Sequence, residues 1–147
     1  MNTKRKSQRE LRIEIINFLY QAELKEELLN PAKIFLDNED LENSQFLKLE
    51  VIAKEYSLYK KWINQFLKEG WSWNRIEPLI RAILLYACYE FLANNQPKVV
   101  INEAMEITKL YYGKENKIKN MVNAILQEIY KLIMVNEFLL RKSEQTN

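Results

Sequence analysis

Helical periodicity runs through almost the whole chain and restricts its fold more than any other feature. Apolar residues recur at three- and four-residue spacing, which places them along one face of an α-helix. Only two glycines and three prolines occur among the 147 residues, so there is little of the turn chemistry that an all-β sandwich or barrel needs. The pattern therefore predicts an all-α domain, built as a bundle of about six or seven helices.

Capping and helix-breaking residues predict where the first helices begin and end. Ser7, with Glu10 three residues later, forms a capping-box pattern that predicts a helix start near Ser7. Asn30-Pro31 is expected to end that helix or to separate it from the next one, because a residue before proline avoids helical dihedral angles. Residues 44–69 are helical again, and the pattern leaves open whether they form one helix or two. Gly70 is expected directly after the end of this segment.

The second half of the chain contains the most apolar helix. Pro78 suits the first turn of a helix that is apolar over most of its surface, which predicts that this helix is central and the most buried. The last helix is expected to begin near Asn116 and to end at about Leu140. The chain, residues 1–147, is predicted to be one domain with a basic tail at 1–6 and a frayed end at 141–147.

The composition excludes most catalytic and metal-binding sites. Because the chain has no histidine, it has no histidine-dependent triad, general base or metal site, and its two glycines, 43 residues apart, form no glycine-rich phosphate loop. The single Cys88 excludes a disulfide framework and a cysteine-based zinc site. Glu90, Glu103 and Glu106 have no histidine or metal partner, so solvated or capping roles are expected. We expect no catalytic residue, no metal and no cofactor.

The sequence also predicts the compartment. No apolar run approaches the roughly 18 residues that a membrane span needs. No secretory signal pattern opens the chain, and its one cysteine suits a reducing environment. We expect a cytoplasmic protein that does not bind a membrane.

Charge is unevenly distributed along the chain. Residues 1–12 hold five Lys and Arg against one Glu, a net charge of +4, whereas residues 23–55 hold nine acids against four lysines, a net charge of −5. A basic end with Tyr20 two turns beyond Arg12 is typical of single-stranded nucleic-acid binding, since cations hold phosphates and an aromatic ring can stack on an unpaired base. The alternative is a helical protein–protein adapter whose acidic stretch binds a basic partner. In that case the amino-terminal cations are a solvated tail.

Four segments follow one another in the order and spacing of a known family. The stretch Pro97–Ile107 reads P-K-V-V-I-N-E-A-M-E-I, and the preceding helix, Arg81–Phe91, reads R-A-I-L-L-Y-A-C-Y-E-F. Arg12 leads into Phe18-Leu19-Tyr20-Gln21, and Met121–Leu126 reads M-V-N-A-I-L. Together these segments, which span residues 9–126, resemble the NusB family of bacterial transcription antitermination factors.

The resemblance implies a fold, a function and partners. The fold would be two packed helical sub-bundles, and the function would be non-catalytic. The protein would bind the boxA element, a short single-stranded RNA of ribosomal RNA leaders, together with NusE, a protein of the small ribosomal subunit. This complex would help the elongating RNA polymerase to resist termination. Since some family members self-associate, the resemblance also implies a homodimer that hides the RNA face as an alternative.

The resemblance also implies roles for individual residues. The expected RNA contacts are Lys4, Arg5, Lys6, Arg9, Arg12 and Tyr20. The expected partner face, toward NusE, comprises Glu77, Arg81 and Glu115. Arg81 can equally form a salt bridge within the chain.

Overall fold

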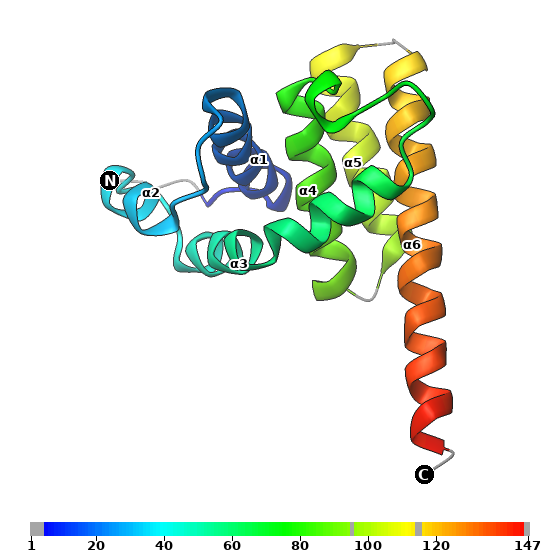
Figure 1. Cartoon of the computed structure of the whole chain (residues 1–147). Coiled ribbons are helices and arrows are strands. Elements are labelled where there is room, and N and C mark those ends of the chain that lie inside the picture. Colours follow the sequence, from blue (N-terminus) through cyan, green and yellow to red (C-terminus); the bar gives the residue numbers. More distant parts are fainter. Residues whose placement is uncertain (1–4, 95, 114–115, 146–147) are drawn as a thin grey trace.

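The computed structural model describes residues 5–94, 96–113 and 116–145 (Figure 1). Within these ranges the chain forms six α-helices and one short 3-10 helix, so the predicted all-α class and helix number are confirmed. The α-helices are α1 (Gln8–Lys25), α2 (Pro31–Asp37), α3 (Asn43–Gln65), α4 (Pro78–Ala93), α5 (Pro97–Tyr112) and α6 (Asn116–Gln145). The 3-10 helix, η1, spans Trp73–Arg75. No helix of the described ranges is both long enough and apolar enough to cross a membrane.

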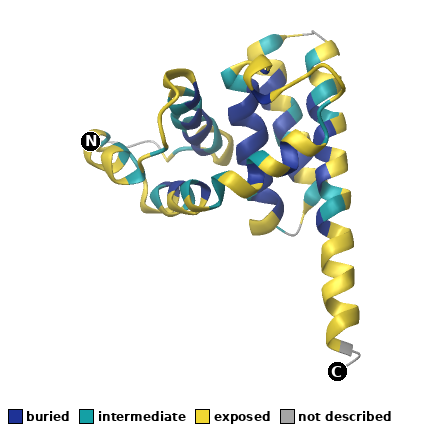
Figure 2. Cartoon of the chain, in the orientation of Figure 1, coloured by how far each residue is buried: buried dark blue, intermediate teal, exposed yellow. Residues whose placement is uncertain are grey.

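Helix α4 is the centre of the molecule, as predicted. It packs against α1, α3, α5 and α6, and every residue from Ile80 to Cys88 is buried. Figure 2 shows it as the darkest helix of the bundle. A helix that is apolar around its whole circumference is stable only where other elements cover all its faces, which is the position that α4 occupies.

Two groups of helices lie on either side of the α1–α4 contact. Helices α1, α2 and the first part of α3 form one group, and α4, α5 and α6 form the other (Figure 1). The second part of α3 crosses from the first group to pack against α4. The arrangement is that of two packed sub-bundles.

The start of α1 agrees with the sequence, whereas the end of α3 differs from it. Helix α1 ends at Lys25, so Asn30-Pro31 separates α1 from α2, which is the second of the two expectations for this pair. The Ser7 hydroxyl accepts a hydrogen bond from the Glu10 amide at 3.1 Å and caps α1, as predicted. The segment after Asn43 is one helix, but it ends at Gln65, so the expectation that Gly70 follows its end directly is wrong. Gly70 lies in a later turn with φ of +88°. The apolar pattern continued past the helix because Phe66 and Leu67 pack on the core from non-helical backbone.

Helix α6 is longer than expected. It continues through Gln145, whereas the sequence pattern predicted an end at about Leu140 and a frayed segment at 141–147, of which 146 and 147 lie outside the described residues. No glycine or proline occurs after Gly113, so no residue interrupts the helix. The end of α6 projects from the bundle with apolar side chains exposed (Figures 1 and 2). These exposed side chains are Met134, Val135, Phe138, Leu139 and Leu140.

Helix α4 is buried and the end of α6 is exposed, so the same Leu→Ala substitution should lower the folding stability by different amounts in the two places. Leu84 is 0% exposed and Leu140 is 64% exposed. We expect Leu84→Ala to lower the free energy of unfolding by about 2–5 kcal/mol, because it leaves a cavity. Leu140→Ala should change it by less than about 0.5 kcal/mol. Urea denaturation of both variants measures this, and equal losses would contradict the central position of α4.

Candidate nucleic-acid interface

Arg9 and Arg12 lie one turn apart at the start of α1, and both meet carboxylates. The Arg9 guanidinium donates from Nε and Nη2 to the two carboxylate oxygens of Glu103 on α5, at 3.1 and 3.0 Å. This is the two-pronged geometry in which guanidinium and carboxylate bind most strongly. The hydrogen bond from Arg9 lowers the pKa of Glu103 below its usual range. The Arg9 charge is therefore balanced within the chain.

Arg12 is held more deeply than Arg9. Its Nε lies 2.5 Å from Oε1 of Glu90, near the end of α4, and its Nη1 lies 3.8 Å from Oε2 of Glu103. The Arg12 and Glu90 side chains are 17% and 8% exposed, against 45% and 21% for Arg9 and Glu103. These two arginines and two glutamates thus join α1, α4 and α5 with no net charge, and only the Arg9 end is open to solvent.

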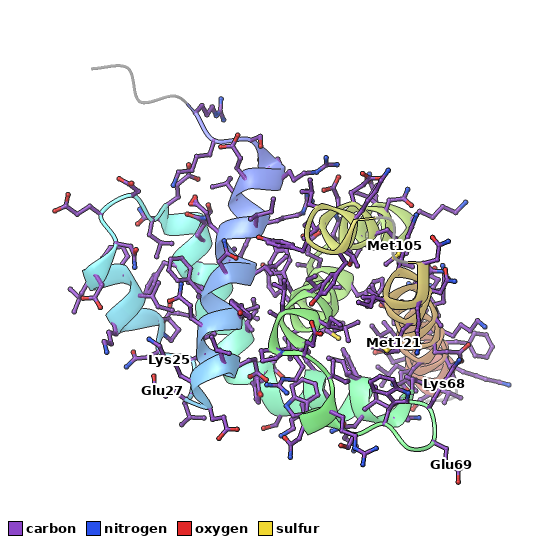
Figure 3. All side chains as sticks on the ribbon, turned by 90° about the horizontal axis from the view of Figure 1, so that it is seen from above. Lys25, Glu27, Lys68, Glu69, Met105 and Met121 are labelled. Atoms are coloured by element: carbon purple, nitrogen blue, oxygen red, sulfur yellow. The ribbon has the colours of Figure 1, made fainter. Side chains whose placement is uncertain are left out.

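Helices α1 and α5 run in the same direction on either side of α4. Glu103 binds Arg9, and eight residues further along both helices the Tyr111 hydroxyl donates to Asn17 Oδ1 at 3.3 Å. Figure 3 shows the assembly from above: Met105 of α5 and Met121 of α6 lie on the side of α4 away from α1. The contacts Arg9–Glu103 and Asn17–Tyr111 therefore join α1 directly to α5 at two places.

The other amino-terminal cations differ in their surroundings. Lys6 forms an ion pair with Glu14 at 2.8 Å and donates to the carbonyl oxygen of Asp40 at 3.0 Å. Arg5 is exposed, and it forms no ion pair with any residue that the structure describes. Lys4 lies outside the described residues. Of the expected cationic RNA contacts, Arg5 and Arg9 are thus the described residues most open to solvent.

Tyr20 does not lie with the arginines. It is eight residues after Arg12, which is about 12 Å along the helix axis. There it lines an open cleft together with Glu77, at the start of α4, and Tyr112, at the end of α5. The Tyr112 hydroxyl donates to Glu77 Oε2 at 2.7 Å, and burial, followed by this contact, raises the pKa of Tyr112. The structure therefore groups Tyr20 with Glu77, a residue that the family resemblance places on the partner face.

Arg81 points into the molecule. Its Nε lies 2.8 Å from Oε1 of Glu23 on α1, and both side chains are less than a tenth exposed. Its Nη1 donates to the carbonyl oxygens of Trp73 and Ile76, at 3.0 and 2.9 Å. Arg81 thus forms the intramolecular salt bridge that was the alternative to a partner contact. Glu115, the remaining residue of the expected partner face, lies outside the described residues.

The sequence missed the carboxylates that hold the arginines. Glu90 and Glu103 were expected to be solvated or capping residues, but both bind arginines of α1, and only Glu106 is exposed as expected. A charged residue inside a nearly continuous apolar helix was the available signal for Glu90. Its partner could not be identified, because the two residues are 78 positions apart.

Comparisons with known proteins agree on one family. A model of the NusB family matches residues 9–131. The transcription antitermination protein NusB of Methylacidiphilum infernorum is 34% identical over 133 residues, covering 85% of this chain and 91% of that protein. The protein of the same name from Fusobacterium nucleatum is 40% identical over 116 residues, covering 72% and 74%. A solved structure of T. maritima NusB superposes with a TM-score of 0.69 at 29% identity, covering 87% of this chain and 93% of that one.

The environment of Arg81 predicts a large loss of stability when it is replaced. Arg81→Leu removes the only cation that ion-pairs with the buried Glu23 among the described residues. We expect the free energy of unfolding to fall by about 3–5 kcal/mol, because an uncompensated charge remains in the interior. The double variant Arg81→Leu with Glu23→Leu should recover much of this loss. Urea denaturation of the single and double variants tests it, and a single variant as stable as the parent protein would refute the structural role.

Proposed function

The chain belongs to the NusB family of transcription antitermination proteins, which are not enzymes, and we propose that it binds boxA-like single-stranded RNA together with NusE. The resulting complex acts on the elongating RNA polymerase. The observation that carries the proposal is the partly exposed Arg9 guanidinium at the start of α1, next to the exposed Arg5. A second surface at the other end of α1, the Tyr20–Glu77 cleft, receives NusE.

The RNA half of the proposal is electrostatic. Arg9, with Arg5 and the basic residues before it, including Lys4, neutralises phosphates, and the released counterions supply affinity that does not depend on sequence. If Lys4, Arg5 and Arg9 neutralise about three phosphates, log affinity falls with log salt at a slope of about −2 for single-stranded RNA. The buried Arg12 fixes α1 against α4 and keeps Arg9 in place. Sequence preference then comes from base contacts that NusE completes.

The partner half of the proposal uses the opposite end of the same helix. The Tyr20–Glu77 cleft offers an aromatic surface and a carboxylate, a combination suited to a protein partner with a cationic side chain. The position of Tyr20 beside Glu77 supports a partner contact over stacking on an RNA base. Because RNA and NusE occupy different ends of α1, both can bind at once. If NusE adds contacts to the bound RNA, RNA and NusE each strengthen the binding of the other by the same factor.

One observation favours the second candidate, a protein–protein adapter that does not bind RNA. Lys6, Arg9 and Arg12 are all paired with carboxylates of the same chain, so the amino-terminal end is less basic than its sequence. In this alternative, partners would occupy the acidic surface of residues 23–55. A homodimer that covers the α1 face would also prevent RNA binding. Light scattering of the free protein detects such a dimer directly.

The RNA contact is tested by removing one cation. We expect Arg9→Gln to weaken binding of a short boxA-like RNA about fivefold at 0.1 M salt, which is the factor for one lost phosphate contact at a slope of about 0.7. Fluorescence anisotropy with the boxA-like RNA and a scrambled RNA, with and without NusE, measures this. Lys54→Gln removes the same charge from an exposed position on α3 and should leave the affinity within twofold.

Three outcomes of that titration decide between the two candidates. Tighter binding of the boxA-like RNA than of the scrambled RNA, strengthened by NusE, supports the antitermination complex. Equal losses in Arg9→Gln and Lys54→Gln would mean that RNA responds only to net charge. Absence of binding to either RNA, even with NusE, would favour the adapter.

The partner surface is tested by reversing one charge. We expect Glu77→Arg to weaken NusE binding about tenfold or more. The substitution replaces a carboxylate in the cleft by a positive charge, which repels the cationic side chain proposed for the partner. Glu77 precedes α4 without capping it through its side chain, so the fold should persist. Isothermal titration calorimetry measures the affinity. Glu69→Arg in the exposed loop after α3 (Figure 3) is the matched control. Unchanged NusE binding by Glu77→Arg would exclude the cleft as the partner site.

A further inference from the structure

We propose that Glu103 competes with RNA phosphate for Arg9 and thereby limits how tightly the α1 face binds polyanions. The inference rests on the proposed RNA binding and concerns its control. It starts from the two ion pairs at the beginning of α1, Arg9–Glu103 and Arg12–Glu90, which differ in how easily they can be exchanged.

The two pairs differ in burial. The Arg12 and Glu90 side chains are almost covered, so separating them would leave a charge without a partner in the interior, which is strongly unfavourable. The Arg9 and Glu103 side chains are more exposed, and a solvated ion pair contributes little to stability. Arg12 therefore stays with Glu90, whereas Arg9 can exchange its partner.

The atoms of Arg9 that contact Glu103 show which other group could bind in place of the carboxylate. Its Nε and Nη2 both bind Glu103 oxygens, so the edge of the guanidinium that suits a phosphate is already occupied. A carboxylate and a phosphate offer that edge the same pair of oxygen acceptors. An RNA phosphate reaching this edge must first displace Glu103.

A second cation is available for the displaced carboxylate. Oε2 of Glu103 lies 3.8 Å from Nη1 of Arg12, so Glu103 can turn toward Arg12 when Arg9 binds a phosphate. Two arrangements of the same groups result, one with Glu103 on Arg9 and one with Glu103 on Arg12. RNA binds only the second, and its affinity is reduced by the share of molecules in the first.

The competition predicts a gain of affinity when the charge of Glu103 is removed. Glu103→Gln keeps the length of the side chain and one oxygen acceptor. We expect both the boxA-like and the scrambled RNA to bind about fivefold tighter at 0.1 M salt, which is the gain if Glu103 holds Arg9 in about four of five molecules of the parent protein. The salt slope should stay close to that of the parent protein, because Arg9 contacts one phosphate in both bound complexes. Glu106→Gln is the matched control. Glu106 lies one turn further along α5, is exposed, and makes no hydrogen bond or ion pair to Arg9 in the described part of the chain.

Fluorescence anisotropy is measured at salt concentrations from about 0.05 M to about 0.3 M. These measurements give both the RNA affinity and its salt slope for each variant. Glu103→Asp serves as a second variant, because it keeps the charge and shortens the side chain by one methylene. Its affinity should stay closer to that of the parent protein than to that of Glu103→Gln. Urea denaturation confirms that each variant is folded.

Each other outcome overturns a defined part of the argument. Weaker RNA binding by folded Glu103→Gln would mean that Glu103 holds Arg9 in position and does not compete with RNA. Equal gains in Glu103→Gln and Glu106→Gln would reduce the effect to net charge. Unchanged affinity in Glu103→Gln, with the parent protein binding RNA, would refute the competition and leave the proposed function intact. No RNA binding by the parent protein or any variant would overturn the proposed function and this inference with it.

Discussion

Two largely covered ion pairs join α1 to α4 and constrain how these helices pack together. Helix α4 is covered on all sides, so its two buried charged residues, Arg81 and Glu90, each need an opposite charge; a buried charge without one costs about 3–5 kcal/mol. Both partners come from α1: Glu23 binds Arg81, and Arg12 binds Glu90. This pairing fixes the direction of α1. A parallel arrangement would bring Arg12 toward Arg81 and Glu23 toward Glu90, placing like charges together in the interior.

The antiparallel docking of α1 on α4 creates both candidate surfaces. The start of α1 lies at the end of α4, where the chain turns into α5, and Arg9 therefore meets Glu103. The end of α1 lies at the start of α4, and Tyr20 therefore shares a cleft with Glu77. The proposed RNA-binding region and the proposed partner-binding region thus occupy opposite ends of one helix.

Local sequence signals correctly predicted the features that depend on residues close together in the chain. The Ser7 cap, the start of α4 at Pro78 and the burial of that helix follow from residues within a few positions of one another. The roles of Glu90 and Glu103 depend on residues 78 and 94 positions away. Local spacing in one sequence cannot identify partners that are so far apart. The expected position of Gly70 shows that a local pattern can also mislead. The apolar pattern continues past Gln65, where α3 ends, because the loop residues also pack on the core.

The charge pattern of the sequence overstates how basic the candidate RNA surface is. Residues 1–12 carry a net charge of +4, but Lys6, Arg9 and Arg12 are each balanced by a carboxylate that lies outside this segment. A balanced surface attracts a polyanion weakly at long range, and at physiological salt charges are screened beyond about 8 Å. In the proposed competition, RNA binding depends on the exchange of the Arg9 partner at contact distance. A ligand that offers phosphates in the right places gains from this exchange, whereas other polyanions gain less.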